Sequence, residues 1–373
     1  MTKRFDHPSP HIALVAGEAS GDRLGAPLLV ELKKRFPNAR FSGVGGVHMQ
    51  ATGFESLLDM RRLSVMGLVE VLKHLPDIYR AKQTLLRYWQ DNPPDIFIGI
   101  DAPDFNLRLA RKFKACGVKT VHYVSPSLWA WKEKRIENIK NTIDLMLCLF
   151  PFELPIYEQH GVKVLCVGHA MQERLRPCEP QQARKELGLP EINGTWLGLF
   201  AGSRLSEQQR LTPIFLDAYQ KLKPYGYQAI MQPNPALEHL SADKQQGVIL
   251  LDAPSHLLMS ASDVLLLKSG TITLEAAFLA RPMVVAHRVN ALTAWLARRL
   301  LKTKRFALPN LLLQQDIVPE LMQEYCNSED IKETLLHLDT KTQQSALKSL
   351  NHLLPPHASV QAANAISDLI TSP

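Results

Sequence analysis

Two short turns in the second half of the sequence carry residues that can bind a phosphate group. They are Gly202-Ser203-Arg204 and Ser269-Gly270-Thr271, each directly after an apolar segment that we expect to be a strand. Glycine lets the backbone approach a ligand closely, the free N–H groups of a helix start favour an anion, and arginine can donate two hydrogen bonds to phosphate. One such turn is equally explained as an ordinary strand-to-helix connection. Two turns at corresponding strand ends predict a nucleotide site in this half of the chain.

Three more polar residues are candidate contacts to such a nucleotide. Glu275 lies about one turn into the helix expected after Thr271, where a carboxylate can accept both hydroxyls of a ribose or simply stabilise the helix start. Asn310 follows a proline that holds the chain extended, so its amide can contact a ligand edge, and Gln323 is a further candidate downstream. The alternative for this region is a surface loop followed by a helix that starts at Pro319.

The loop after the first expected strand, residues 12–16, is also polar and contains glycine. Its candidate sugar-binding residues are Glu18, Ser20, Gly21 and Asp22. Acids and a serine in a tight glycine turn can bind sugar hydroxyls or, alternatively, cap a helix. The GxGxxG spacing is absent, so the sequence does not support a dinucleotide-binding fingerprint.

Asp101 is the first polar residue after the expected strand 96–100, at its carboxyl edge. A carboxylate there can accept the proton of a hydroxyl nucleophile within hydrogen-bond reach. His122 is the rival base, although a histidine inside a strand is more often packed and hydrogen bonded. Ser125 follows in the same loop region and is a candidate sugar contact.

Short apolar segments alternate with longer helical patterns, which predicts a parallel α/β protein. We expect strands at residues 12–16, 40–44, 96–100, 120–124, 145–149 and 164–167, and a second series at 196–200, 228–231, 248–251, 264–267 and 283–286. The predicted fold is two doubly wound, Rossmann-like domains facing a cleft, with ligands at the carboxyl ends of the strands. The predicted domains are residues 1–175 and 176–350, followed by a C-terminal helical segment, residues 351–373.

The net charge of +7 and the pI near 9.1 favour an anionic partner: nucleic acid, an anionic membrane surface or a phosphorylated small molecule. Aromatic residues make up 7% and do not interleave with basic ones, which ranks nucleic acid last. Five widely spaced cysteines without a CxxC pair argue against a disulfide framework or a structural zinc site. Because no apolar stretch reaches the roughly 18 residues that span a bilayer, and an apolar signal core is absent, we expect a cytoplasmic protein.

One predicted helix has an apolar face suited to a membrane surface. This apolar face consists of Val65, Met66, Leu68, Val69, Leu72 and Leu75. Basic residues around it outnumber the acidic ones, so the face fits an anionic membrane interface. The alternative is a helix that packs this face on the sheet.

Taken together, these segments resemble the lipid-A-disaccharide synthase family of GT-B type glycosyltransferases, and the resemblance covers nearly the whole chain. Its most specific parts are Gly17-Glu18-Ala19-Ser20-Gly21-Asp22, Val65-Met66-Gly67, Gly99-Ile100-Asp101-Ala102-Pro103-Asp104-Phe105-Asn106, His122-Tyr123-Val124-Ser125-Pro126-Ser127, Trp129-Ala130-Trp131, Gly202-Ser203-Arg204, Ser269-Gly270-Thr271, Glu275 and Leu308-Pro309-Asn310-Leu311. Lys268 and residues 232–247 depart from the family pattern.

The resemblance implies that UDP-2,3-diacylglucosamine and 2,3-diacylglucosamine 1-phosphate give a β-1,6-linked lipid A disaccharide and UDP, with inversion at the anomeric centre. Asp101 matches the family aspartate proposed as the base. The first domain would bind the acceptor and the second UDP, with Arg204 at the leaving diphosphate and no bound metal or other cofactor. The resemblance also implies a peripheral location on the cytoplasmic face of the inner membrane. The C-terminal segment would return to the first domain of its own chain or of a homodimer partner.

Two other classes of protein remain as alternatives. Another GT-B enzyme, such as a UDP-N-acetylglucosamine 2-epimerase or the transferase that makes the peptidoglycan lipid intermediate, would have a similar UDP site but different loops in the first domain. A non-catalytic nucleotide-binding protein would use the apolar face to engage a membrane or a partner.

Overall fold

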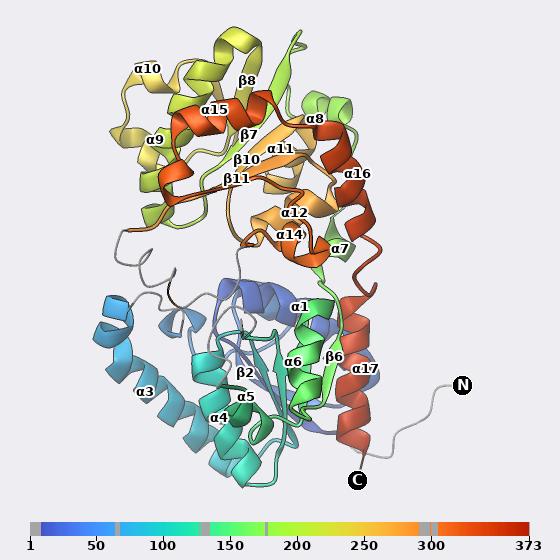
Figure 1. Ribbon diagram of the computed structural model, residues 1–373. Helices are drawn as coiled ribbons and strands as arrows, with labels where there is room; N and C mark the ends of the chain where they lie inside the picture. Colours follow the sequence, from blue (N-terminus) through green and yellow to red (C-terminus); the bar gives the residue numbers. More distant parts are fainter. Residues whose placement is uncertain are drawn as a thin grey trace. The chain divides into compact units, whose positions relative to one another are not determined.

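The computed structural model describes residues 9–63, 68–126, 128, 135–175, 178–290, 299 and 305–372. The chain forms two compact units, of which unit 1 consists of Met1–Ala170 with Leu354–Pro373, and unit 2 of Met171–Leu353 (Figure 1). The chain therefore passes from unit 1 to unit 2 and returns to unit 1 at its C-terminal end.

Within the described residues, unit 1 contains a six-stranded parallel sheet of strand order β2-β1-β3-β4-β5-β6. Its strands are β1 (His11–Ala16), β2 (Arg40–Val44), β3 (Ile96–Ile100), β4 (Lys119–Tyr123), β5 (Leu145–Cys148) and β6 (Val164–Cys166). Its helices are α1 (Ala19–Arg35), α2 (Val47–Gln50), α3 (Leu68–Asp91), α4 (Pro103–Ala115), α5 (Arg135–Lys140), α6 (Leu154–Gln159) and α17 (Ala358–Thr371). The chain leaves β1 for β2 on one side and continues with β3 on the other. This reversal point, between β1 and β3, is where doubly wound sheets bind ligands.

Unit 2 repeats this plan with the strand order β12-β11-β10-β7-β8-β9, again six-stranded and parallel in the described part. Its strands are β7 (Thr195–Phe200), β8 (Tyr227–Met231), β9 (Val248–Leu250), β10 (Val264–Lys268), β11 (Met283–His287) and β12 (Glu320–Met322). Its helices are α7 (Met171–Arg174), α8 (Pro180–Glu186), α9 (Leu205–Leu222), α10 (Ala242–Gln245), α11 (Ser255–Ala261), α12 (Ile272–Phe278), α14 (Leu308–Leu313), α15 (Ser328–Leu336) and α16 (Thr340–Leu350). Its reversal point lies between β7 and β10.

The two sheets confirm the predicted pair of Rossmann-like folds. Strands β1 and β3 are buried along their whole length, which explains why their sequences are apolar throughout rather than alternating. The sequence does not predict β12, and the alternative of a helix that starts at Pro319 is wrong. Residues Glu320–Met322 instead pair with β11 as an edge strand, where a preceding proline costs no ladder hydrogen bond.

Each unit has its own hydrophobic core. In unit 1, Trp89 of α3 and Phe113 of α4 pack with their ring centroids 5.2 Å apart, and both contact Phe97 of β3. In unit 2, Phe215 and Tyr219 of α9 are fully buried in the second core. Burying a large apolar side chain contributes about 1.5–3 kcal/mol, so these contacts hold the helices on their sheets.

Helix α17 packs on α1 in unit 1 (Figure 1). Arg35 donates hydrogen bonds of 2.9 and 2.6 Å to the side-chain oxygen of Asn364. Lys119 Nζ donates one of 2.9 Å to the carbonyl oxygen of Leu369. Polar contacts in the middle and near the C-terminal end of the helix thus supplement its buried apolar side, which includes Ala362 and Ile366.

Candidate active site

The carboxylate of Asp101 lies at the reversal point of unit 1, directly after β3. Ser20 Oγ, from the first turn of α1, donates a 2.6 Å hydrogen bond to Asp101 Oδ2, and the Ala102 N–H donates one of 2.9 Å to Oδ1. Glu18 is half-buried just before α1, and Gly21 is buried in its first turn. The structure therefore brings the loops after β1 and β3 together around one oriented carboxylate.

The backbone at Asp101 is strained. Asp101 and Ala102 have φ angles of 55° and 43°, in the left-handed region, which costs on the order of 1–3 kcal/mol for a non-glycine residue. Asn106 Nδ2 stabilises this turn by donating hydrogen bonds of 2.7 and 3.3 Å to the carbonyl oxygens of Asp101 and Ile100. Gly17 provides the space, because a Cβ there would lie 2.4 Å from Ala102 Cβ. Strain that is maintained by its surroundings is typical of a functional site.

Asp22, a predicted sugar contact, is buried and bonded to the loop after β2. The residue is 1% exposed, and its carboxylate accepts hydrogen bonds from the N–H groups of Gly46, His48 and Met49 at 2.8, 3.0 and 3.0 Å. These bonds satisfy the free N–H groups at the start of α2, as an N-cap would. Asp22 thus caps α2 and fixes the loop after β2 from within unit 1, and its contact with a sugar stays a prediction.

His122 and Ser125 are also internal to unit 1. His122 in β4 is 0% exposed, and burial lowers its pKa to about 4, so the imidazole is neutral at neutral pH. Ser125 shares a 2.7 Å hydrogen bond with the hydroxyl of Tyr157 and is itself buried. The imidazole of His122 is therefore closed to solvent, whereas the carboxylate-bearing residue Asp101 is partly exposed.

The two predicted phosphate-binding turns meet at the reversal point of unit 2. Strands β7 and β10 are hydrogen-bonded neighbours, so the turns Gly202-Ser203-Arg204 and Ser269-Gly270-Thr271 leave adjacent strand ends. Gly202 has a φ of 107°, and a Cβ there would lie 2.5 Å from Glu207 Oε2, so this turn requires glycine. Helix α9, of 18 residues, starts immediately afterwards and directs its first N–H groups toward the turn.

Glu207 links the two turns electrostatically. Its Oε1 lies 3.0 Å from Arg204 Nη1 and 3.0 Å from Lys268 Nζ, the last residue of β10. Burial raises the pKa of the Glu207 carboxyl, but the hydrogen bonds and charges of Lys268 and Arg204 outweigh this effect and hold the pKa below its usual value. The sequence does not assign a role to Glu207 or Lys268, because their proximity follows from the pairing of two strands far apart in the chain.

Glu275 lies in α12 close to the second turn and is half-buried. Ser255 Oγ, at the start of α11, donates a 2.7 Å hydrogen bond to Glu275 Oε1. This bond orients the carboxylate, which can still accept further hydrogen bonds such as those from ribose hydroxyls. Sequence reasoning missed Ser255, since it precedes Glu275 by 20 residues and no local pattern joins them.

Asn310 is internal to unit 2 rather than free to contact a ligand edge. It is 1% exposed, its Nδ2 donates to the carbonyl oxygen of Val318 and to Glu320 Oε1, both at 2.8 Å, and its Oδ1 accepts from the Val318 N–H. These bonds tie α14 to β12. Gln323 is half-buried directly after β12, with a φ of 54°.

The predicted membrane contacts fall largely outside what the structure describes. Val65 and Met66 lie outside the described residues, as does Trp129-Ala130-Trp131. Leu68, Val69, Leu72 and Leu75 belong to the backbone of α3, but their side chains are not described, so the apolar face stays a prediction. In the described part of the chain, no helix is both long and apolar enough to cross a membrane.

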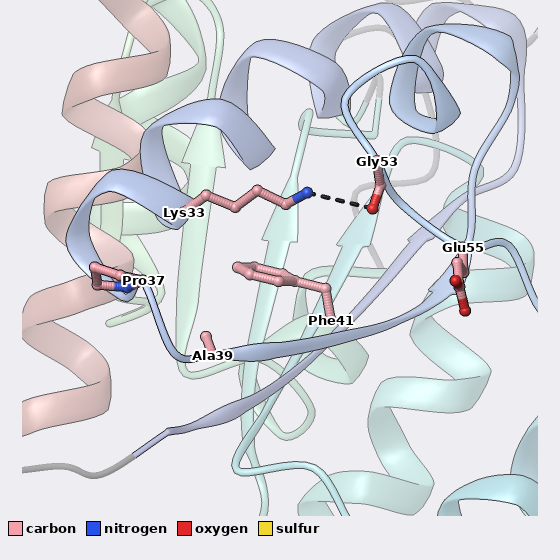
Figure 2. A pocket seen from close by; sticks show the side chains of 6 residues that line it. All are labelled: Lys33, Pro37, Ala39, Phe41, Gly53 and Glu55. Atoms are coloured by element: carbon pink, nitrogen blue, oxygen red, sulfur yellow. Dashed lines mark hydrogen bonds between the residues drawn. The ribbon is translucent and has the colours of Figure 1, made fainter.

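Other possible ligand sites lie elsewhere. An open cavity of about 380 Å³ is lined by Lys33, Pro37, Ala39, Phe41, Gly53 and Glu55 (Figure 2). It lies near the amino end of β2, whereas Asp101 follows the carboxyl end of β3. Beside this cavity, Lys33 Nζ donates a 2.7 Å hydrogen bond to the carbonyl oxygen of Thr52. Among the described residues, no group of three His, Cys, Asp or Glu side chains is arranged to hold a metal ion. The candidate active site therefore consists of the residues at the two reversal points.

The sequence profile of a family described as lipid-A-disaccharide synthetase matches residues 12–364. A lipid-A-disaccharide synthase of Alcanivorax borkumensis is 44% identical over 99% of this chain and 100% of its own length. Another, of Pseudomonas fluorescens, is 46% identical over 96% of this chain and 98% of its own length.

Solved structures resemble the chain at low sequence identity. The glycotransferase of kitacinnamycin has a TM-score of 0.70 at 15% identity, over 97% of this chain and 99% of its own. S. aureus MnaA, solved with UDP, has a TM-score of 0.66 at 13% identity, over 97% of both chains. These likenesses show a shared GT-B fold.

Proposed function

The chain belongs to the lipid-A-disaccharide synthase family and is a glycosyltransferase of lipid A biosynthesis, and from this premise we propose its substrates and the residues that act on them. The donor is UDP-2,3-diacylglucosamine, the acceptor is 2,3-diacylglucosamine 1-phosphate, and the products are the β-1,6-linked disaccharide 1-phosphate and UDP. One observation supports this assignment most directly. Of two equivalent reversal points, one presents an oriented carboxylate and the other presents glycine turns with basic side chains.

Asp101 is the general base in this proposal. Its carboxylate accepts the proton of the acceptor 6-hydroxyl while that oxygen forms a bond to the anomeric carbon of the donor. The bond from the anomeric carbon to the diphosphate oxygen breaks, its electron pair leaves with UDP, and the anomeric centre is inverted. Ser20 and Asn106 support the role by holding the carboxylate and its backbone, because small errors in position cost a base much of its effect.

Unit 2 binds the UDP part of the donor. The N–H groups at Gly202 and Ser203 and the guanidinium of Arg204 contact the diphosphate, and Glu275 accepts the ribose hydroxyls. Charge that develops on the leaving diphosphate is offset by Arg204 and the start of α9, so the proposal requires no metal ion or other cofactor. Turnover is expected to survive treatment with a chelator. Loss of activity that a divalent cation restores would contradict this part of the proposal.

The function is tested with the two purified diacylated substrates. Incubation with both is expected to give a disaccharide phosphate, identified by mass, in a one-to-one ratio with UDP. Incubation with the donor alone is the control for a related enzyme such as an epimerase. UDP release or donor isomerisation that needs no lipid acceptor would reject the synthase assignment for this chain.

We also propose that the protein binds peripherally to the anionic cytoplasmic face of the inner membrane through the apolar face. Acylated substrates reside in a bilayer, and an apolar helix with basic surroundings suits its surface. Replacing Leu68, Val69 and Leu72 by serine is expected to release the protein from anionic vesicles without changing its thermal unfolding. Unfolding instead of release would show that the apolar face packs inside unit 1.

A homodimer that exchanges its C-terminal segment is the remaining part of the proposal. Within one chain α17 packs on α1, and the same contacts can form between two chains. Chemical cross-linking between α1 of one chain and α17 of another, in a mixture of tagged and untagged protein, tests the exchange. Cross-links confined to single chains would contradict it.

A further inference from the structure

We propose that Lys268 is a second cation that binds the diphosphate of the donor, beside Arg204. The inference rests on the proposed function, since it adds a residue to the same donor site. Lys268 is one of the positions at which the sequence departs from the family pattern. It is the last residue of β10.

The ammonium of Lys268 lies between the two phosphate-binding turns. Its side chain is 15% exposed, and Nζ is 3.0 Å from Glu207 Oε1, beside the first turn. A Cβ built on Gly270 would lie 3.4 Å from the same Nζ, so the ammonium also borders the second turn. An anion bound at both turns would therefore lie next to this cation.

Among the described residues, two cations share one carboxylate between the turns. Glu207 Oε1 lies 3.0 Å from both Arg204 Nη1 and Lys268 Nζ, so the carboxylate is divided between them. Arg210 adds a further cation on α9 and donates to the carbonyl oxygen of Arg288. His287, at the end of β11, has its pKa lowered to about 4, chiefly by burial and also by Lys268, so it adds no charge at neutral pH.

A largely buried ammonium that shares its carboxylate with a second cation is stabilised further when an anion binds beside it. The donor diphosphate supplies two negative charges, and departure of the sugar adds another. The Lys268 ammonium is placed to bind the diphosphate and to stabilise the charge that grows as UDP leaves. Glu207 is the positioning residue that keeps the flexible lysine side chain between the turns before the donor binds.

The first test measures UDP affinity by titration calorimetry on the full-length protein. Lys268→Met is expected to weaken UDP binding about tenfold to thirtyfold, because one charge-assisted hydrogen bond is lost. The affinity for uridine, which lacks the diphosphate, is expected to change less than about twofold. Lys268→Arg is expected to retain UDP affinity within about threefold, and Lys268→Gln serves as a second neutral variant if Lys268→Met does not fold.

A double variant separates contact with the ligand from mere neutralisation of Glu207. If Lys268 binds the diphosphate, Lys268→Met combined with Glu207→Gln is expected to remain about tenfold weaker for UDP than Glu207→Gln alone. If Lys268 only neutralises the carboxylate, the double variant binds UDP as well as Glu207→Gln, and the inference is overturned.

Lys221→Met is the matched control. Lys221 is also an ion-paired lysine of unit 2, 2.6 Å from Glu329, but it lies 16 residues beyond the start of α9, roughly 24 Å along the helix. Its replacement is expected to leave UDP affinity unchanged. Wild-type protein that does not bind UDP would contradict the proposed function, whereas normal UDP binding by Lys268→Met and Lys268→Gln would overturn this inference alone.

Discussion

The reversal points of the two units share a topology but differ in how their turns are built. In unit 1 the turn after β3 places two non-glycine residues, Asp101 and Ala102, at φ angles of 55° and 43°. In unit 2 the corresponding positive φ angles belong to Gly202 and Gly270, at 107° and 157°. Unit 1 thus accepts backbone strain in order to orient one side chain, whereas unit 2 removes side chains so that a ligand can approach the backbone.

The two sites are alike in how they hold a carboxylate. In unit 1 Ser20 donates a 2.6 Å hydrogen bond to Asp101, and in unit 2 Ser255 donates one of 2.7 Å to Glu275. The charges around the sites differ, because Lys268 and Arg204 lie beside the turns of unit 2 and share the carboxylate of Glu207. The comparison teaches that one fold can present either a base or an anion site, depending on the turn residues.

The largest expected effect comes from removing the base. Asp101→Asn keeps the shape of the side chain but cannot accept the proton, and we expect kcat to fall about a thousandfold or more. UDP affinity, which belongs to unit 2, is expected to stay within about twofold of wild type. Rates from the mass-detected assay and titration with UDP check the two expectations. A kcat within about tenfold of wild type would remove Asp101 from the role of base.

Unit 1 also contains a buried carboxyl that makes stability depend on pH. Glu153 accepts hydrogen bonds from the Leu149 and Phe150 N–H groups. Burial raises the pKa of this carboxyl to about 8. The folded protein therefore keeps a proton that the unfolded chain has already lost, so stability falls as the pH rises toward 8. Between pH 6.5 and 8 this fall amounts to roughly 2 kcal/mol.

Glu153→Gln cannot titrate, so its stability is expected to change less over that interval than that of the wild type. Urea unfolding of both proteins at pH 6.5 and pH 8 measures the difference. Buried His122 and His169, each with a pKa lowered to about 4 by burial, act in the opposite direction and reduce stability as the pH falls from about 6.5. Parallel curves for the two proteins between pH 6.5 and 8 would show that Glu153 ionises normally.

Ser20→Ala is expected to lower kcat about tenfold, because the Asp101 carboxylate loses the hydroxyl that orients it. UDP affinity is expected to be unchanged, and thermal unfolding serves as the control for folding. A decrease confined to UDP affinity, with kcat preserved, would show that Ser20 acts in donor binding and does not orient Asp101.

Ser255→Ala is expected to have the smallest effect, about fivefold weaker UDP binding with kcat at saturating donor unchanged. A UDP analogue that lacks both ribose hydroxyls makes no use of Glu275, so its affinity is expected to be the same for both proteins. Equal losses for UDP and the analogue would mean that Ser255 supports the fold of α11 rather than the ribose contact.

Local sequence patterns were sufficient for much of the fold and part of the site. Short apolar segments predicted the strands, since a strand buried on both faces needs no alternation. The glycine turns and Asp101 could be found because each directly follows such a segment, and the resemblance to one family supplied a reaction. Strand β12 escaped prediction because three edge residues after Pro319 leave no periodic signal.

Tertiary structure decided which polar residues are buried in internal hydrogen bonds and which stay partly exposed at the reversal points. Asp22 bonds to N–H groups 24 to 27 positions away, and Asn310 bonds to β12, so both are held by internal hydrogen bonds although the sequence suggested ligand contacts. Lys268 and Glu207 meet only because β10 lies beside β7. A side chain's residue type limits what it can do, but strand order determines its neighbours, and those neighbours fix its hydrogen bonds, burial and charge.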